Sequence, residues 1–411
     1  MKAMLSYLFE FMTFAFPKAG AEIGVPITIA IGLFGFALLK CRRQVIPALI
    51  DVKGLAFFYT LFVSAVLVSL FVNPGNFELF QLATVAAVTV SPLAIGIGRS
   101  VNPQTALKIL AISLIIAGAY AVIQRMVGIV TTAIPGVTYT FGQDLAEKPI
   151  GYGMAGSGEA QKMPSTYQNG NGAGLFYAMA IPVLLAWMPA AAKQRALKMS
   201  AILFGCAGLL LSGSRSIVLP FLFFLLFLLV LLKNRFSYRN QLLFVSGLMF
   251  VVFLGSVYLL ATDPQFLQPL YARYIEQTLS DPTGAGRTSQ FVDALAQVNA
   301  LDGPSFLRFL TIGLPWDQIS TLEGMVSILF NYGVFGFIGF FGALTAAILG
   351  IYRSHKLASI GFLCVFMAFL VDGSFNFPPT LMNLFFLTGL LTQPQSLETQ
   401  KAMSAGSGSR M

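Results

Sequence analysis

Long unbroken runs of apolar residues constrain this chain more than any other feature. Ile217–Leu232 and Leu242–Ala261 hold few polar side chains, and Met325–Ile351 is broken only by small residues and one Asn-Tyr pair. Runs of about 20 residues match the hydrocarbon thickness of a bilayer, where the backbone must satisfy its own hydrogen bonds as a helix. The alternation of a transmembrane β-barrel is absent from the sequence. We therefore predict an all-α polytopic membrane protein.

Composition agrees and excludes several function classes. The 411 residues are 56% hydrophobic and only 10% charged, and the mean hydropathy is +0.79, which is too apolar for a soluble chain of this length. The net charge of +9 comes from short basic clusters between apolar runs, a pattern that orients a membrane protein rather than binding nucleic acid. Cys41, Cys206 and Cys364 share no spacing, and the single histidine, His355, stands alone. We expect neither a metal nor another cofactor.

The apolar runs predict about twelve transmembrane helices, which lie near Leu5–Phe16, Gly24–Leu39, Gly54–Val72, Phe77–Ile97, Thr105–Val122, Gly174–Met188, Met199–Leu211, Ile217–Leu232, Leu242–Ala261, Glu323–Ile351, Leu357–Val371 and Pro379–Leu391.

Every second connection between these spans is basic. Lys193, Arg195 and Lys198 fill one such connection, whereas Asn73–Asn76 carries no Lys or Arg. The positive-inside rule places the basic connections and both termini in the cytoplasm. The two long loops, residues 128–173 and 262–322, then face outward, and long loops of this kind commonly carry function. Residues 1–400 form one integral membrane domain in this interpretation, and residues 401–411 form a flexible, Gly/Ser-rich cytoplasmic tail.

Three basic residues lie where the orientation rule does not favour them. Arg215 ends the outward turn Ser212-Gly213-Ser214-Arg215, which supplies hydroxyls, backbone N–H groups and a helix start beside the guanidinium; this combination suits an anion, although Arg215 also fits a snorkelling anchor. Arg287 follows Gly286 and opens an amphipathic stretch, Ser289–Ala300, and it also fits an ordinary loop arginine. Lys162 precedes an Asn/Gly-dense segment that enters a span directly.

That segment contains Tyr167, Asn169 and Asn171, which we count with Ser214 as candidate substrate-binding residues. A turn followed by a helix cap is the alternative interpretation of the same residues.

One acid is a candidate general base. Glu323 lies at the outer mouth of the span that contains Gly333 and Gly336, where partial desolvation would raise its pKa towards a useful range. A favourable charge at a helix N-terminus is the alternative. Glu10, Glu78 and Asp372 also lie near predicted membrane boundaries, but no local motif supports them.

In this order the motifs resemble the O-antigen polymerase and ligase superfamily, which includes the Wzy-type polymerases. The resemblance covers roughly residues 162–336 and is carried by Ser165-Thr166-Tyr167-Gln168-Asn169-Gly170-Asn171, Ser212-Gly213-Ser214-Arg215, Gly286-Arg287, and Glu323 through Gly333 and Gly336.

The resemblance implies a metal-independent, inverting glycosyltransferase of the GT-C type in the bacterial inner membrane. It would polymerise undecaprenyl-diphosphate-linked repeat units, for O-antigen or exopolysaccharide, at the periplasmic face. Arg215 and Arg287 would hold the donor diphosphate with help from Lys162, and Glu323 would activate the acceptor. A histidine heads the late Gly-x-x-Gly span of the ligases and is missing here, which favours a polymerase.

The implied partners are lipid-linked oligosaccharide as donor and acceptor, membrane lipid, a chain-length co-polymerase and a flippase. Two alternatives stay open. One is a ligase-like transferase that passes the glycan to another acceptor, and the other is a non-enzymatic transporter or flippase. A transporter predicts charged or broken helices at mid-membrane, whereas the notable charges here lie near the predicted outer edge and the spans look mostly uninterrupted.

Overall fold

The structure is a computed structural model, and it describes residues 2–73, 79–145, 150, 162–167, 169–231, 268–280, 287–315 and 322–393. These residues are mostly helical, and their two strands, β1 (Gly20–Ile23) and β2 (Val25–Thr28), pair antiparallel as a hairpin. The predicted span 242–261 and the tail 401–411 lie outside the described residues.

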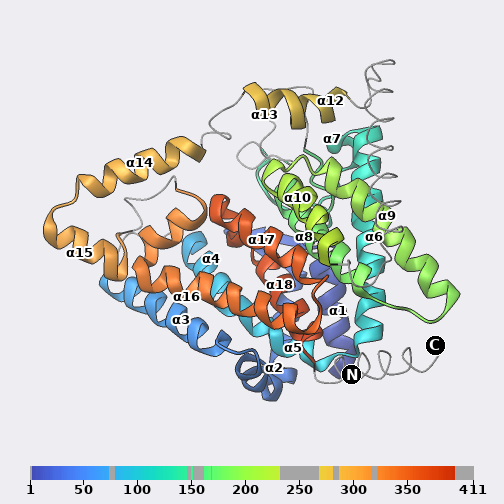
Figure 1. The fold of residues 1–411 in the computed structure, drawn as a ribbon, viewed down its shortest axis with the longest axis horizontal. Helices are drawn as coiled ribbons and strands as arrows, with labels where there is room; N and C mark the ends of the chain where they lie inside the picture. The colour runs from blue at the N-terminus through green and yellow to red at the C-terminus, as the bar shows by residue number, and fades with distance from the viewer. Residues whose placement is uncertain are drawn as a thin grey trace.

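The helices follow one another along the chain as α1 (Lys2–Ala15), α2 (Ile29–Asp51), α3 (Leu55–Val72), α4 (Leu79–Val90), α5 (Ala94–Ser100), α6 (Pro103–Val127), α7 (Ile129–Thr132), α8 (Gly170–Ala186), α9 (Ala192–Leu211), α10 (Arg215–Leu231), α12 (Gln268–Tyr271), α13 (Gln277–Ser280), α14 (Arg287–Asn299), α15 (Gly303–Ile312), α16 (Gly324–Ser354), α17 (Ser359–Val371) and α18 (Pro378–Leu391) (Figure 1). Two 3₁₀ turns, η1 (Ser91–Leu93) and η4 (Gly373–Asn376), and one π-helical turn, η2 (Ala272–Glu276), complete the secondary structure.

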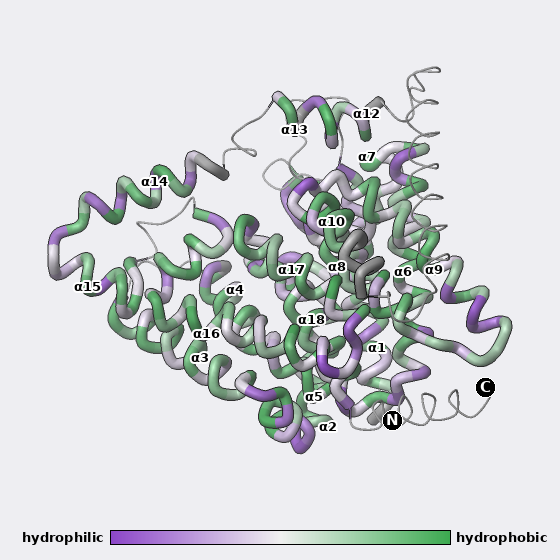
Figure 2. The backbone as a smooth tube through the Cα atoms, in the orientation of Figure 1, coloured by the Kyte–Doolittle hydropathy of each residue, from purple (hydrophilic) through white to green (hydrophobic). Residues whose placement is uncertain are grey.

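Five of the described helical stretches are long and apolar enough to cross a membrane: α3, 81–100, α6, α9 and α16. Several shorter apolar helices accompany them, including α8, α17 and α18. Figure 2 shows hydrophobic residues along the central helices, and hydrophilic ones at the start of α9 and along α14. The all-α membrane class predicted from the apolar runs is therefore confirmed.

Two helix starts differ from the prediction. Helix α2 begins only at Ile29, after the hairpin, and continues to Asp51, so that the basic residues after Leu39 lie on a helix rather than in a loop. Gly24 turns the hairpin at a φ of +71°, and the Thr28 hydroxyl caps α2 by accepting from the N–H of Ile31. Helix α9 likewise begins at Ala192 and includes the whole basic cluster near its start. Hydropathy marks the apolar part of a helix, whereas caps set where it begins.

A third difference concerns the predicted span 77–97. Its described part bends at the 3₁₀ turn η1, which separates α4 from α5 and contains Pro92. Proline lacks the N–H that would continue the α-helical hydrogen bonds, so the helix is interrupted there.

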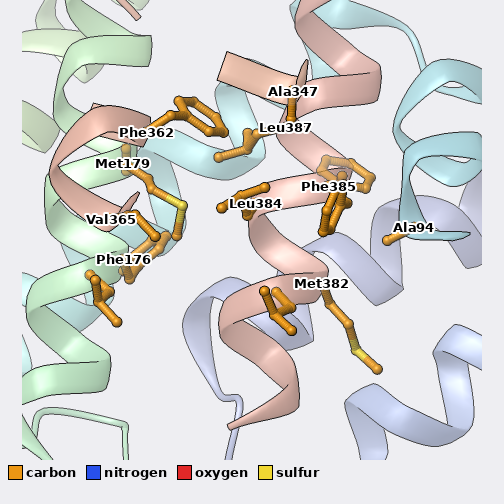
Figure 3. Packing of buried hydrophobic residues seen from close by; sticks show 14 of the residues in the cluster. Ala94, Phe176, Met179, Ala347, Phe362, Val365, Met382, Leu384, Phe385 and Leu387 are labelled. Carbon is orange, nitrogen blue, oxygen red and sulfur yellow. The ribbon is translucent and has the colours of Figure 1, made fainter. Parts of the chain in front are cut away.

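The centre of the molecule is built by α8 and α18, which are buried along almost their whole length. Helices α9, α17 and α10 pack around α8, while α5, α1 and α16 pack against α18. Figure 3 shows Phe176 and Met179 of α8 packing with Val365 of α17 and Leu384 of α18. These central helices position the start of α8 and the end of α17, where polar residues gather.

Helix α16 is broken in its N-terminal half. Gly333 has a φ of +65° and a ψ of −171°, and a side chain there would meet the backbone of Thr311 at 2.6 Å. The carbonyls of Phe330 and Asn331 accept from the N–H of Leu314 and the hydroxyl of Ser69 at 2.6 Å each. The break is thus filled by the end of α15 and by α3, so one predicted uninterrupted span is in fact interrupted.

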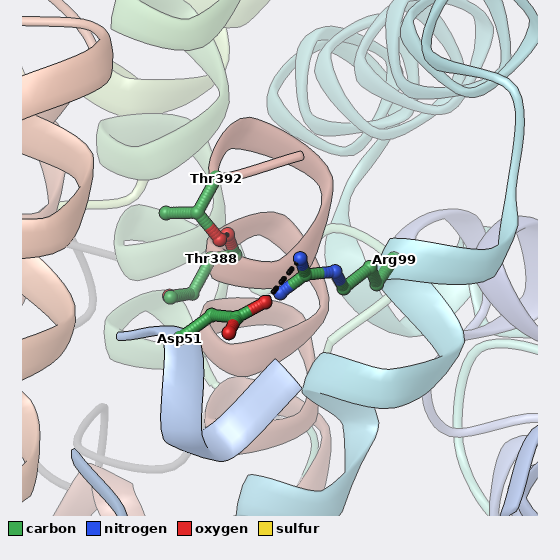
Figure 4. Close-up of polar contacts among 4 residues, drawn as sticks. All are labelled: Asp51, Arg99, Thr388 and Thr392. Atoms are coloured by element: carbon green, nitrogen blue, oxygen red, sulfur yellow. Dashed lines mark hydrogen bonds and ion pairs between the residues drawn. The ribbon is translucent and has the colours of Figure 1, made fainter. Parts of the chain in front are cut away.

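An ion pair fastens the opposite part of the bundle. Arg99 of α5 pairs with Asp51 at the end of α2, close to Thr388 and Thr392 of α18 (Figure 4). Exposed ion pairs contribute little to stability. Because the Arg99 side chain is only 11% exposed and Asp51 is 53% exposed, the pair orients the arginine more than it stabilises the fold.

Candidate functional site

A tight turn joins α9 to α10 and carries the Ser-Gly-Ser-Arg motif. Gly213 adopts a φ of +62°, a left-handed conformation that favours glycine. Ser214 is buried, and its carbonyl accepts from the N–H groups of Ile217 and Val218 at 3.1 and 2.9 Å. The Ser214 hydroxyl lies 3.3 Å from that of Ser216. The motif therefore ends one helix and starts the next, with half-buried Arg215 as the first residue of α10.

Lys162 lies across this turn. A side chain added at Gly213 would come within 3.0 Å of Lys162 Cγ, and one added at Gly170 within 2.9 Å of Lys162 Cβ. The next residue, Met163, donates its N–H to the carbonyl of Leu211 at 3.0 Å. The two glycines let the lysine stem lie flat against the backbone, so its ammonium group is held beside the start of α8.

A hydrogen-bonded chain runs from Lys162 to a buried carboxylate. Lys162 Nζ donates to Asn171 Oδ1 at 3.2 Å, and Asn171 Nδ2 donates to Asp372 Oδ2 at 2.5 Å. Asp372 is 5% exposed, and its Oδ1 accepts from the N–H of Ser374 at 2.8 Å and from the Ser374 hydroxyl. The sequence named Asp372 without a supporting motif; the structure joins it to two predicted site residues, and we call these three the Lys162–Asn171–Asp372 chain.

Glu323 lies beside the turn that follows Asp372. It is exposed, immediately precedes α16, and its Cγ is 3.8 Å from where a side chain on Gly373 would begin. Because Gly373 follows Asp372 directly, the Glu323 carboxylate and the Lys162–Asn171–Asp372 chain border the same turn.

Two predicted site residues have structural contacts. Asn169 caps α8, since its Oδ1 accepts from the N–H of Gly172 at 2.9 Å, which is the helix-cap alternative left open by the sequence. Tyr167 is fully buried, stacks on Phe176 and donates its hydroxyl to the carbonyl of Phe14 at 2.9 Å. We therefore assign Tyr167 to the wall behind the site and give it no substrate contact.

Arg287 begins α14, as the sequence predicted, but its side chain lies outside the described part of the structure. Helix α14 packs through Ala294 against Phe309 of α15 and Val326 of α16. Figure 1 shows it at the side of the molecule, away from α10. The structure therefore places the backbone of α14, while the contacts of the Arg287 side chain lie outside its described part.

Another arginine reaches that turn. Arg273, in η2, donates from Nε to the carbonyl of Gly213 at 2.9 Å. Its neighbour Tyr274 donates to the carbonyl of Leu210 at 2.7 Å, and burial raises the pKa of this phenol. Sequence reasoning missed Arg273 because no motif surrounds it. The flanking tyrosines at 271 and 274, in an otherwise polar loop, were the available signal.

A second missed cation is Lys18, which follows α1. Its side chain is buried, and its Nζ lies 5.3 Å from the ring centre of Phe377. That ring in turn packs edge-on against Tyr167 and touches the Gly172 position. Lys18 therefore adds positive charge behind the start of α8.

Taken together, Lys162, Arg215 and Arg273 surround one glycine turn at the start of a 17-residue helix. Guanidinium and ammonium groups beside a helix N-terminus form an anion site, and arginine suits phosphate oxygens in particular. Within the described residues no group of three or more His, Cys, Asp or Glu side chains is placed to hold a metal ion.

No protein-family model matches the chain, and no curated protein matches it in sequence.

Proposed function

We propose that this protein is a membrane glycosyltransferase that polymerises undecaprenyl-diphosphate-linked oligosaccharide repeats at the periplasmic face, as an O-antigen or exopolysaccharide polymerase. One observation carries the proposal. Lys162 and Arg273, which are far apart in the sequence, both contact the Gly213 turn that ends in Arg215. A cluster of cations in a protein of apolar helices suits a ligand with a charged head and a lipid tail.

Glycosyl transfer from a lipid diphosphate requires a cationic site of this kind. Transfer of a sugar from a lipid diphosphate breaks the bond between the anomeric carbon and the phosphate oxygen, and negative charge develops on the diphosphate. Fixed cations stabilise that charge most where water is scarce. Removing one such group typically costs about 3–4 kcal/mol of transition-state stabilisation, or about a hundred- to thousandfold in rate.

Of the two neighbouring carboxylates, Glu323 suits the role of base better. Asp372 already accepts from Asn171 and twice from Ser374, so both of its oxygens are engaged within the protein. Glu323 is exposed and borders the turn at Gly373, next to Asp372. In our proposal it takes the proton of the acceptor hydroxyl as that oxygen attacks the anomeric carbon from the face opposite the diphosphate, which inverts the configuration.

The finer architecture belongs to the same proposal. We infer about twelve spans with a GT-C-like arrangement, both termini in the cytoplasm, and location in a bacterial inner membrane. Donor and acceptor would both be lipid-linked oligosaccharides, and a chain-length co-polymerase and a flippase would act beside the enzyme. Arg287 stays a candidate second diphosphate ligand through the loop that precedes α14.

Reconstitution with synthetic lipid-linked repeats tests the proposal. Arg215→Ala, Arg273→Ala and Lys162→Ala should each lower the rate of polymer formation about a hundredfold or more. Arg195→Ala is the matched control, because Arg195 is an exposed arginine near the other end of α9, and it should leave the rate unchanged. Full polymerisation by all three site variants would overturn the assignment.

The product distinguishes the transferases. A ladder of repeat lengths identifies a polymerase, whereas a single transfer to another acceptor identifies a ligase-like enzyme.

The transporter alternative gains one observation, the break of α16 at Gly333, because broken helices line the paths of many transporters. In the same vesicles, movement of lipid-linked sugar between leaflets without any new glycosidic bond would favour that alternative over a transferase.

A further inference from the structure

Helices α14 and α15 form a hairpin whose apolar surface is only partly covered by the protein. At 100° per residue, each helix carries a continuous apolar arc. One edge of each arc is packed: Ala294 of α14 and Phe309 of α15 are buried together with Phe330 of α16. The other edge is open.

The open edges carry large side chains. Val292 is 62% exposed and Leu295 63%, while Leu307 is 63% exposed with Phe306 beside it. We call these four residues the open face of the hairpin. Asp293 and Gln297 are exposed on the opposite side of α14. Each helix is therefore amphipathic and exposes apolar side chains that its packing does not use, and large apolar side chains exposed together in one segment mark an interaction site.

The hairpin is fixed at the end of a predicted membrane span. Arg308, next to Leu307, donates to the carbonyl of Val72 at 3.1 Å and to Asn73 Oδ1 at 2.8 Å. Asn73 in turn donates to the carbonyl of Gly313 at 3.2 Å, which ties the end of α15 to the same point. Val72 is the last residue of α3, one of the helices long enough to cross a bilayer, so α15 lies within one arginine side chain of the membrane boundary.

The position of α15 near the end of α3 corresponds to the polar headgroup zone of a bilayer. This zone extends roughly 5–7 Å beyond the hydrocarbon on each side. The exposed apolar side of α3 reaches the same place, since Phe71 is 84% exposed and its neighbour Val72 is half exposed. If α3 crosses the membrane, lipid covers Phe71 at this point, and Arg308 ties the helix that carries Phe306 and Leu307 to the next residue, Val72.

We propose that the α14–α15 hairpin lies in the membrane interface, with its open face, Val292, Leu295, Phe306 and Leu307, buried at the boundary between lipid headgroups and acyl chains. Amphipathic helices bind membranes in this way, with their polar side in the headgroup water. The proposal depends on the position of the hairpin and stands apart from the proposed glycosyl transfer.

Fluorescence quenching tests the depth. In a Cys206→Ala background, which removes the exposed cysteine and keeps the two buried ones, single cysteines at Leu295 and Leu307 are compared with matched controls at Asp293 and Gln297. Each carries an environment-sensitive dye in vesicles of phosphatidylcholine and phosphatidylglycerol. Nitroxide lipids labelled near the headgroup should quench the dyes at 295 and 307 at least about twofold more than the control dyes, and iodide should do the reverse.

Three results would overturn the proposal. Equal quenching at test and control positions would mean that the open face stays in water. Stronger quenching by nitroxides at the acyl-chain ends would mean that the segment crosses the membrane. Energy transfer between donor- and acceptor-labelled chains at Leu307, independent of protein density in the vesicles, would mean that a second copy covers the face. The melting temperature of each labelled protein confirms that it remains folded.

Discussion

Asn171 Nδ2 lies 2.5 Å from Asp372 Oδ2, although 201 positions separate the two residues. The contact joins the first turn of α8 to the end of α17, and it fixes how the Asn171 amide is turned. Its nitrogen faces the carboxylate, so its oxygen faces Lys162 Nζ. Asp372 thus orients the Lys162 ammonium through the Asn171 amide.

Replacing the Asp372 carboxylate with an amide should therefore disturb the position of the Lys162 ammonium group. We expect Asp372→Asn to lower the rate of polymer formation about 10- to 100-fold, because hydrogen bonds to charged groups are worth about 1.5–3 kcal/mol. Asp51→Asn is the matched control, since Asp51 pairs with Arg99 far from this site. The rate is measured in reconstituted vesicles over a range of donor concentrations. An unchanged rate in Asp372→Asn would show that Lys162 does not depend on this carboxylate.

The break in α16 gives a prediction for stability. Gly333→Ala should lower the free energy of unfolding by about 2–4 kcal/mol, because a side chain there is strained at positive φ and would meet Thr311 backbone atoms at 2.6 Å. Gly32→Ala on α2 is the control, because nothing lies within 4 Å of its added carbon, and its stability should stay equal or rise by up to about 1 kcal/mol. Thermal unfolding in detergent compares the two; equal melting temperatures would contradict the close approach of α15.

The single histidine makes a pH effect assignable. His355 follows α16, and burial lowers its pKa from the ordinary 6.5, against a smaller opposing effect from the backbone of Leu391. Between its folded-state and unfolded-state pKa values, the unfolded chain binds more protons, so stability is present above the unfolded value and is lost as the pH falls.

We therefore expect the melting temperature to drop between about pH 7.5 and about pH 5.5, and His355→Gln to remove most of that drop. The same pH series on both proteins measures it. A drop of equal size in His355→Gln would assign the effect to other groups.

Sidedness is a further prediction. A cysteine at Ala192, where α9 begins, should react with a membrane-impermeant maleimide only from the cytoplasmic side, because the positive-inside rule assigns the adjacent basic cluster to that side. A cysteine at Glu276 of η2 should react only from the periplasmic side. Both positions are exposed, so each serves as the accessibility control of the other in oriented spheroplasts. Labelling of both from one side would contradict the topology.

The sequence predicted best those elements whose signal is local. The apolar runs place α3, α16, α17 and α18 within a few residues of their observed bounds, and the amphipathic spacing after Arg287 predicts α14. Hydropathy could not reveal the break at Gly333, because its cause is the end of α15 pressing on the helix from 20 or so residues away. Hydropathy also could not show whether a basic cluster lies in a loop or in the first turns of a helix. The cluster after Ala192 lies on α9.

The candidate site shows the same division. Lys162, Asn171 and Arg215 lie in motifs, so the sequence could name them as candidates, whereas Arg273 and Lys18 have no motif and come to this region only through tertiary packing. Asp372 was visible as an acid near a predicted boundary, but its partners lie 201 positions away. Pairings over such distances are set by how α8, α17 and α18 pack, and a single sequence does not record that packing.

The contact between Asn171 and Asp372 also bears on how the protein is made. The ribosome synthesises α8 long before it completes α17. During that time Asn171 and Lys162 are in the membrane-inserted chain without the Asp372 carboxylate that later joins them in one chain of hydrogen bonds. The last two helices, which complete the centre of the bundle, therefore also complete the charge balance of the site. Truncation before Asp372 would leave nascent chains with a polar α8 entrance that insertion chaperones and quality-control proteases can recognise.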